Sequence, residues 1–382
     1  MNAQTVQLDL TQRSMESRDF ELGLRRMIVG QDEAVQAVVD LYQVFRAELN
    51  SPGRPVGNLL FLGPTGAGKT RVVEAAAELL FGNPNAILRV DCAEFQHSHE
   101  IAKLIGSPPG YLGHRETNPL ITQEALEQYH TDNLRISFLL FDEIEKASAA
   151  LWQLLLGILD KATLTLGDNT RVDLSQTIIF MTSNLGGSEI SELSAGRMGF
   201  ASAVQSDTKL QLNQKVEKTA VDAATRKFAP EFLNRIDKMV VFHPLQSEQL
   251  EKILDMELRN VQKRVLETAK GRFLFRVMPA AKEFLLREGT DMKYGARHLK
   301  RAIERYVVSP LATLLGTGQV SLGDVISINW NGVEPRLAFS KEEPKAAIIP
   351  CTWMMTDSPE SPVARHSSGR GVVIPSTAAV LQ

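Results

Sequence analysis

The chain has 382 residues, 43% of them hydrophobic and 23% charged, which is the composition of a globular protein long enough for two domains and a tail. The formal net charge of −3 gives no global reason to expect nucleic acid or an acidic membrane as a partner. The two cysteines, Cys92 and Cys351, exclude a disulfide framework and a cysteine-rich zinc module. A polar N-terminus and the absence of any apolar run of ~18 residues predict neither a signal peptide nor a membrane span, so we expect a cytoplasmic protein.

The first part of the chain leads from helical patterns into a strand. Residues 1–19 are polar and are expected to form a flexible lead-in, and residues 20–30 form an amphipathic stretch. Asp32 is a suitable N-cap for a helix that ends before the Pro/Gly-rich residues 51–55. An apolar strand over residues 57–62 then enters a glycine-rich loop, and a helix leaves it.

That loop matches G-x-x-x-x-G-K-[ST], the pattern of a phosphate-binding P-loop. Its backbone N–H groups can turn inward as an anion nest, and the following helix directs its positive end at the same point. Lys69 would reach the β- and γ-phosphates, and the Thr70 hydroxyl would hold Mg²⁺. The loop residues expected to bind the nucleotide are Gly63, Pro64, Thr65, Gly66, Ala67, Gly68, Lys69 and Thr70.

Apolar periodicity predicts the elements that follow. Strands are expected at residues 86–92, 136–141, 177–181 and 238–242, and helices at 119–130, 148–160 and 209–228. Irregular segments rich in Gly, Pro or Ser are expected at 106–113 and 186–208, and a polar loop before residue 177. Apolar strands that alternate with helices predict an α/β fold with a parallel sheet covered on both faces.

From about Ser247 helical patterns dominate, which predicts a small, mostly helical second domain. Its helices are expected at 247–270, 279–289 and 295–316, and its short strands at 273–277 and 324–330. The sequence beyond is rich in proline and serine and is expected to be disordered. The predicted divisions are a lead-in (1–19), an α/β domain (20–245), a helical lid (246–335) and a tail (336–382).

Polar residues follow two of the predicted strands. Asp142 would support the Mg²⁺ shell, and Glu143 would orient and polarise an attacking water. Asn184 follows the next strand and could position the same water or touch the γ-phosphate, although asparagine at a strand end is also a common turn residue. Because ligands in parallel sheets bind at the carboxyl ends of the strands, we predict that the P-loop, the two carboxylates and Asn184 converge.

Seven motifs occur in order between about residues 20 and 332. They are V-G-Q-D-E-A-V at 29–35, the P-loop, L-I-G-S-P-P-G-Y at 104–111, F-D-E-I-E-K-A at 141–147, M-T-S-N-L-G at 181–186, P-E-F-L-N-R-I-D at 230–237 and Y-G-A-R at 294–297. Together they closely resemble the AAA+ ATPases of the Clp/heat-shock disaggregase family, specifically the second ATPase module of ClpB, ClpA and ClpC. The resemblance implies ATP and Mg²⁺ as cofactors, a homo-oligomeric ring expected to be a hexamer, and a polypeptide substrate threaded through a central pore.

The resemblance also implies roles for residues that spacing alone does not assign. Arg235 matches the arginine finger, which reaches the nucleotide of the neighbouring subunit, and Arg297 matches the sensor-2 arginine of the lid. Ile28 and Val29 match the residues that flank adenine. From position alone, each arginine would instead be expected to form a surface salt bridge or to pair with a carboxylate, as most arginines do.

Two loops resemble sites for protein partners. Gly110, Tyr111, Leu112 and Gly113 match the substrate-gripping pore loop, where a tyrosine offers a large contact area with few rotatable bonds; the alternative is a tyrosine that anchors its own loop. Residues 160–172 match a second pore loop more weakly. Met198, Gly199 and Phe200 lie where protease-coupled members carry a tripeptide that docks into ClpP, and incidental apolar loop residues are the alternative.

The sequence therefore predicts an ATP-dependent protein unfoldase or remodeller, with a ClpP-type protease or an adaptor as a further candidate partner. Two other functions stay open. One is a nucleic-acid-linked AAA+ protein, which the net acidity and the Pro-Pro-Gly-Tyr loop disfavour. The other is an ATP-driven conformational switch for one partner that threads nothing.

Overall fold

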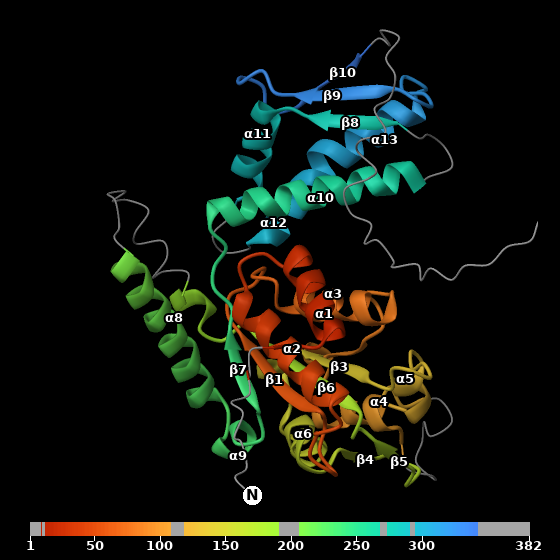
Figure 1. The fold of residues 1–382 in the computed structure, drawn as a ribbon, viewed down its shortest axis with the longest axis vertical. Helices are drawn as coiled ribbons and strands as arrows, with labels where there is room; N and C mark the ends of the chain where they lie inside the picture. The colour runs from red at the N-terminus through yellow and green to blue at the C-terminus, as the bar shows by residue number, and fades with distance from the viewer. Residues whose placement is uncertain are drawn as a thin grey trace, which may run out of the picture. The chain divides into compact units, whose positions relative to one another are not determined.

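The computed structural model describes residues 9, 12–107, 118–190, 206–267, 273–290 and 295–342. Its central feature is a five-stranded sheet with the order β2-β3-β6-β1-β7 (Figure 1). The strands are β1 (Gly57–Leu62), β2 (Leu88–Asp91), β3 (Ser137–Asp142), β6 (Thr177–Ser183) and β7 (Lys238–Val241). Each neighbouring pair is parallel, which confirms the predicted α/β sheet.

Helices cover both faces of this sheet because its central strands are apolar at nearly every position. β1, β3 and β6 are buried along almost their whole length, and successive side chains point to opposite faces. Phe61, Phe138 and Phe180 pack on one face against α1 (Met15–Met27), α2 (Asp32–Arg46) and α3 (Lys69–Phe81). On the other face, the cluster that includes Leu60, Phe141 and Met181 packs against α6 (Ala149–Lys161), α8 (Ser206–Lys227) and α9 (Pro230–Leu233).

Short elements connect the larger ones between β2 and β6. They are η1 (Cys92–Glu94), η2 (Ser98–Glu100), α4 (Ile101–Ile105), α5 (Gln123–Glu127) and η3 (Ile144–Lys146). The helix predicted for residues 119–130 is therefore only five residues long. The polar loop predicted before residue 177 is wrong in part, because β4 (Thr163–Thr165) and β5 (Arg171–Asp173) form an antiparallel pair there. Each strand has one buried side chain, Leu164 and Val172, and these two residues lie opposite each other.

The C-terminal subdomain, residues 247–342, has its own apolar cluster and a sheet of order β10-β9-β8 (Figure 1). Its helices are α10 (Ser247–Glu267), α11 (Pro279–Gly289), α12 (Ala296–Ile303) and α13 (Ser309–Gly316), with a π-helical turn at Glu304–Val308, and its strands are β8 (Leu274–Val277), β9 (Val325–Asn329) and β10 (Ala338–Glu342). The stretch Met1–Lys341 forms one compact unit. The domain boundary expected near residue 245 therefore stays a prediction.

Three predicted boundaries need correction. The lead-in predicted for residues 1–19 is too long, because α1 begins at Met15 and the side chain of Phe20 packs against Tyr42 with ring centroids 4.8 Å apart. The disordered tail predicted from residue 336 begins too early, because Leu337 is buried in the apolar cluster of the C-terminal subdomain and β10 extends the small sheet. The exposed loop predicted for residues 186–208 is wrong at residues 187–190, which are helical and bury Ile190.

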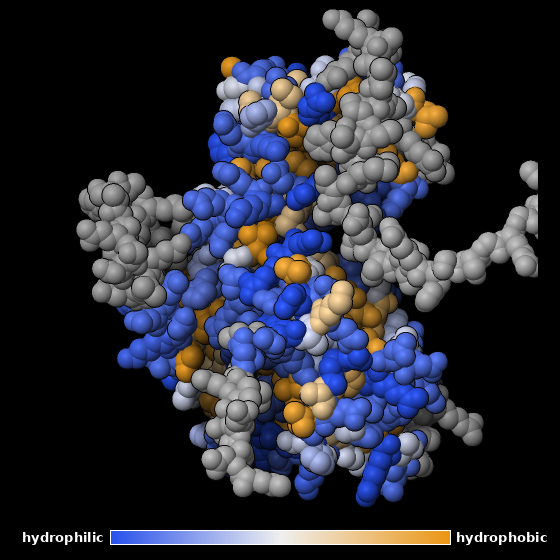
Figure 2. All heavy atoms as spheres, in the orientation of Figure 1, coloured by the Kyte–Doolittle hydropathy of each residue, from blue (hydrophilic) through white to orange (hydrophobic). Residues whose placement is uncertain are grey.

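The face of the molecule that Figure 2 draws is mainly hydrophilic. On the face drawn in Figure 2, apolar side chains lie in small, separated groups among charged and polar ones. Within the described part of the chain, none of the helices is both long and apolar enough to span a membrane.

Candidate functional site

The P-loop leaves the carboxyl end of β1 and leads into α3, as predicted. Gly63, Gly66 and Gly68 have φ angles of +139°, +78° and +102°, which side chains with a Cβ rarely adopt. A Cβ at Gly63 would also lie 2.5 Å from the carbonyl oxygen of Phe242. Gly68 caps α3 without a side-chain hydrogen bond, so the first N–H groups of the helix face the loop and not a capping side chain. The loop thus has the backbone conformation of an anion-binding nest.

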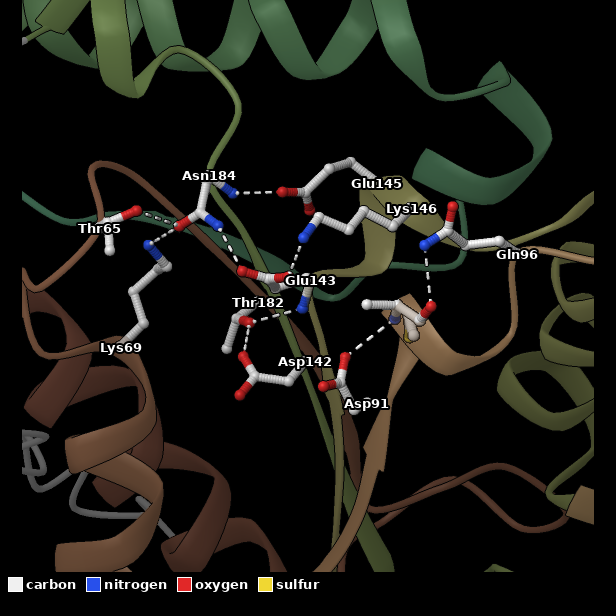
Figure 3. Close-up of polar contacts among 12 residues, drawn as sticks. Thr65, Lys69, Asp91, Gln96, Asp142, Glu143, Glu145, Lys146, Thr182 and Asn184 are labelled. Carbon is white, nitrogen blue, oxygen red and sulfur yellow. Dashed lines mark hydrogen bonds and ion pairs between the residues drawn. The ribbon is translucent and has the colours of Figure 1, made fainter.

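Lys69 is the buried cation of this loop. Its Nζ donates to the carbonyl oxygens of Gly63 and Pro64 at 2.8 and 2.9 Å. It also donates to Asn184 Oδ1 at 2.9 Å (Figure 3). Burial lowers the pKa of Lys69 to about 8, and the carboxylates of Glu145 and Asp142 oppose that shift. The ammonium group is therefore held at the loop with its charge only partly compensated.

Asn184 joins the three predicted parts of the site. Its Oδ1 accepts from Lys69 and, at 3.3 Å, from the hydroxyl of Thr65, while its Nδ2 donates to Glu143 Oε1 at 3.2 Å (Figure 3). Strands β1, β3 and β6 lie side by side and end together, so residues more than one hundred positions apart meet at one edge. The P-loop, Glu143 and Asn184 therefore lie together, as predicted from their positions at the ends of the strands.

Glu143 has a left-handed backbone, with φ at +56°, a conformation that costs a residue with a Cβ about 1–3 kcal/mol. Its N–H donates to Thr182 Oγ1 at 3.1 Å, and that hydroxyl donates in turn to Asp142 Oδ1 (Figure 3). A hydrogen bond from Lys146 is the main cause that lowers the pKa of Glu143, so its carboxylate is ionised at neutral pH. Thr182 thus links the two carboxylate residues, a role that its position in the motif did not reveal.

These residues face one cavity of about 570 Å³, within the size range of small-molecule sites. Of the predicted nucleotide residues, Ile28, Val29, Thr65, Gly66, Ala67, Gly68, Lys69, Thr70, Asp142, Glu143, Asn184 and Arg297 line it. The lining includes apolar side chains suited to contact a base, namely Ile28, Val29, Leu245, Ile253 and Met256. Arg297 and Lys300, from the C-terminal subdomain, also line it, and Lys300 pairs with Glu257 at 2.9 Å. Apolar side chains together with cations such as Lys69 and Arg297 fit a nucleotide.

Several lining residues were not predicted. Gln31 and Arg89 come from the α/β part of the chain, and Ile253, Met256 and Asn260 come from α10. Arg89 lies 3.8 Å from Asp142 and 3.6 Å from Glu74, so it ties strand β2 to the carboxylate. Gln31 lies within the V-G-Q-D-E-A-V motif at 29–35, close to Ile28 and Val29, and that motif is the signal that could have identified it.

Other predicted residues lie elsewhere. Gly63 and Pro64 support the P-loop through their carbonyl groups, and neither is among the described residues that line the cavity. Arg235 is not among them either: it donates to the carbonyl oxygen of Glu231 at 2.7 Å and lies 3.8 Å from Asp160. The predicted pore loop (Gly110, Tyr111, Leu112 and Gly113) and the predicted docking tripeptide (Met198, Gly199 and Phe200) lie outside the described residues.

Comparisons with known proteins agree with this geometry. A family model described as an AAA domain (Cdc48 subfamily) matches residues 54–239, and one described as the C-terminal, D2-small domain of ClpB protein matches residues 245–328. The chaperone protein ClpB of Pseudomonas putida is 40% identical over 311 residues, which cover 81% of this chain and 33% of that protein. The ATP-binding subunit ClpC of the ATP-dependent Clp protease of Staphylococcus saprophyticus is 36% identical over 328 residues, which cover 86% of this chain and 38% of that protein.

A solved structure shows the same fold. A closed-state cryo-EM reconstruction of Hsp104 with ATPγS and FITC casein matches with a TM-score of 0.69 and 28% sequence identity, over 85% of this chain and 52% of that one. The chain spans about a third of the length of the curated relatives it matches. It belongs to the AAA+ ATPases of the ClpB and ClpC family, corresponds to their second ATPase module, and as such is an enzyme that binds and hydrolyses ATP.

Proposed function

We propose that the chain is an ATP-driven protein remodeller that works as a homo-oligomeric ring, expected to be a hexamer, and threads polypeptide through the pore of that ring. The observation that carries the proposal is the cavity, which residues of the α/β sheet and of the C-terminal subdomain line together. A nucleotide bound there would contact both, so binding and hydrolysis would move one against the other. That movement is the force-generating step of the proposal.

The reaction itself is assigned to five side chains. Lys69 binds the β- and γ-phosphates. Asn184 is held between Lys69 and Glu143, so it positions the carboxylate of Glu143 relative to the γ-phosphate. Glu143, ionised at neutral pH, accepts a hydrogen bond from the attacking water and polarises it. Thr70 and Asp142, which line the same cavity, are the oxygen ligands that would hold Mg²⁺, whose charge would stabilise the phosphate oxygens.

The two arginines are proposed to act from different subunits. Arg297 lines the cavity of its own chain and would contact the γ-phosphate there. Arg235 pairs with Asp160 on its own chain, and we propose that it reaches the nucleotide of the next copy in the ring. An arginine supplied in trans makes hydrolysis depend on assembly, which explains why a ring is required.

The pore is proposed to consist of Gly110, Tyr111, Leu112 and Gly113, assisted by the β4–β5 turn. The support comes from Ile105 and Gly106, which precede this segment in the chain. The N–H of Gly167, in the β4–β5 turn, donates to the carbonyl oxygen of Ile105 at 2.8 Å, and a Cβ at Gly167 would lie 2.6 Å from the carbonyl oxygen of Gly106. The backbone that leads into residues 110–113 therefore adjoins the turn within the segment proposed as the second pore loop.

The test is unfolding of a tagged fluorescent protein in the presence of ATP. Wild type and Tyr111→Phe should unfold it, whereas Tyr111→Ala should hydrolyse ATP without unfolding it. Glu143→Gln should bind ATP, hydrolyse it at least a hundredfold more slowly and abolish unfolding. Glu251→Gln, on the exposed face of α10, is the matched control and should behave as wild type.

Two results would redirect the proposal. ATPase activity that is unaffected by Tyr111→Ala, with no unfolding by wild type, would indicate a conformational switch for one dedicated partner, and stimulation of the ATPase by DNA would indicate a nucleic-acid-linked protein. In a parallel sample, degradation of the substrate after addition of a ClpP-type protease would support protease docking by Met198, Gly199 and Phe200. Loss of degradation, but not of unfolding, in Phe200→Ala would assign the contact to this tripeptide.

A further inference from the structure

Gln31 is a buried polar residue whose side chain joins two segments that are far apart in the sequence. It lies directly before α2 and is 5% exposed. Its Nε2 donates to the carbonyl oxygen of Ala67 at 3.1 Å and to that of His243 at 2.9 Å, and its Oε1 accepts from the N–H of His243 at 3.3 Å. Both N–H bonds of the amide and one lone pair of its oxygen are thereby used.

The two segments are the parts of the molecule that a nucleotide would move. Ala67 lies in the P-loop between Gly66 and Gly68, both of which have positive φ. His243 begins the linker, residues 243–246, which leads from β7 to α10. Leu245 of that linker and Ile253 and Met256 of α10 line the same cavity as the P-loop. Gln31 therefore connects the P-loop, through Ala67, with the linker that leads into the C-terminal subdomain.

The far end of the linker is held against the residue before Gln31. Gly30 has a φ of +75°, and a Cβ there would lie 2.1 Å from Gln249 Nε2, so the side chain of Gln249, in the first turn of α10, packs on the Gly30 backbone. Gln249 Oε1 accepts from the N–H of Gln246 at 2.8 Å, which fixes the last linker residue. Residues 30 and 31 thus contact both ends of the linker, and Gln31 also contacts the P-loop.

We propose that Gln31 is a positioning residue that couples the conformation of the P-loop to the linker, and through it to the placement of Arg297 over the nucleotide. A buried amide donor that loses its acceptor is strongly penalised, so Ala67 and His243 can shift together at little cost but cannot separate without that penalty. Nucleotide that reshapes the P-loop would therefore shift the linker as well. A coupling of this kind changes an equilibrium by roughly 5- to 150-fold.

The first experiment compares Gln31→Met with Gln36→Met in the full chain. Met keeps the length of the side chain and removes its hydrogen bonds, and Gln36, which donates to Asp40 on the exposed face of α2, is the matched control. We expect Gln31→Met to lower kcat about tenfold while the affinity for a fluorescent ATP analogue changes less than threefold. Gln36→Met should change neither.

Amide hydrogen exchange separates coupling from a purely structural role, because a residue with only a structural role would not change how nucleotide protects the linker. In wild type, a non-hydrolysable ATP analogue should protect both the P-loop amides and the linker amides of His243, Leu245 and Gln246. In Gln31→Met it should still protect the P-loop but no longer the linker. Equal protection of the linker in variant and wild type would overturn the proposal, and so would a parallel loss of P-loop protection and affinity, which would make Gln31 a residue of the binding site itself.

Two further variants keep the test decisive. If Gln31→Met fails to fold, Gln31→Glu keeps the acceptor for His243 N–H but sets an oxygen against the two carbonyl oxygens, and it should show the same loss of linker protection. In an Arg297→Ala background, Gln31→Met should lower kcat less than twofold further, because the residue it positions is absent; a full tenfold loss there would refute the route through Arg297. The proposal rests on nucleotide binding at this site and not on threading, so the exchange result holds even if the unfolding assay fails.

Discussion

Gly295 offers a sharp test of how the C-terminal subdomain meets the P-loop. It precedes α12, which carries Arg297, and has φ +51° and ψ −139°, a combination that only glycine adopts readily. A Cβ there would lie 2.8 Å from the carbonyl oxygen of Gly66 and 3.0 Å from its carbonyl carbon. The same carbonyl oxygen accepts from the N–H of Ala296 at 3.3 Å. Because the obstacle is backbone of the P-loop, a methyl group cannot be accommodated by rotating a side chain.

The Gly295→Ala variant should therefore lose activity without losing its fold. The backbone strain alone is about 1–3 kcal/mol, and it is relieved only if α12 moves away from the P-loop. If the closed arrangement is the one that hydrolyses ATP, that energy lowers kcat/KM roughly 5- to 150-fold, at 1.4 kcal/mol per factor of ten. The assay is steady-state ATP hydrolysis, with thermal unfolding measured on the same samples.

The matched control is Gly316→Ala, at the end of α13. Its added Cβ meets no atom within 4 Å, and its φ is not positive, so the substitution should leave kcat/KM unchanged and raise stability by about 0.5–1 kcal/mol. Equal kcat/KM for the two variants would refute the argument that contact between Gly295 and Gly66 sets the position of Arg297. A collapse of the thermal transition in Gly295→Ala would show that the contact supports the fold and not the site.

Three further predictions follow from individual residues. The pKa of Lys69 is about 8, and its protonated form binds phosphate. The affinity for ATP should therefore be highest below pH 8 and weaken by up to about tenfold per pH unit above it, which equilibrium titrations between pH 7 and 9.5 would reveal. An affinity that does not change over this pH range would contradict the prediction. Asn184→Ala removes the link between Lys69 and Glu143 and should lower kcat about 10²–10³-fold in single-turnover hydrolysis, whereas a loss under threefold would deny the link a role. Leu337→Ala should lower the free energy of unfolding, measured by urea titration, by about 2–4 kcal/mol because Leu337 is buried. The control, Leu322→Ala, replaces a residue that is 75% exposed and should change the free energy of unfolding by less than about 0.5 kcal/mol. Similar values for both variants would mean that the fold ends before β10.

Much of the site could be predicted because its signals are local in the sequence. The P-loop combines glycines, a lysine and a threonine at fixed spacing between a strand and a helix, and each of these requirements acts over a few residues. Asp142, Glu143 and Asn184 could be assigned because they follow apolar strands, and the carboxyl ends of parallel strands meet at one edge of a sheet. The contacts of Asn184 with Lys69 and Glu143 agree with that expectation.

The predictions that failed concern short elements whose identity depends on neighbours. The β4–β5 pair has three residues in each strand, too few for a clear alternating pattern, and it exists because Leu164 and Val172 are buried. β10 reads as the start of a polar tail, but its pairing with β9 and the burial of Leu337 make it part of the small sheet. Pairing and burial are properties of the folded chain, so local composition cannot reveal them.

Periodicity and motif spacing encode the parallel α/β fold, the nucleotide loop and the carboxylates beside it, so these features could be predicted from the amino acids alone. Three features depend on the folded chain: which residues of α10 line the cavity, the link that Thr182 makes between Asp142 and Glu143, and the bridge that Gln31 forms between Ala67 and His243. Gln31 and His243 are 212 positions apart, and a hydrogen bond between a side chain and a distant backbone leaves no pattern in the amino acids near either partner. Such contacts depend on the packing of the whole chain, which brings the two segments together.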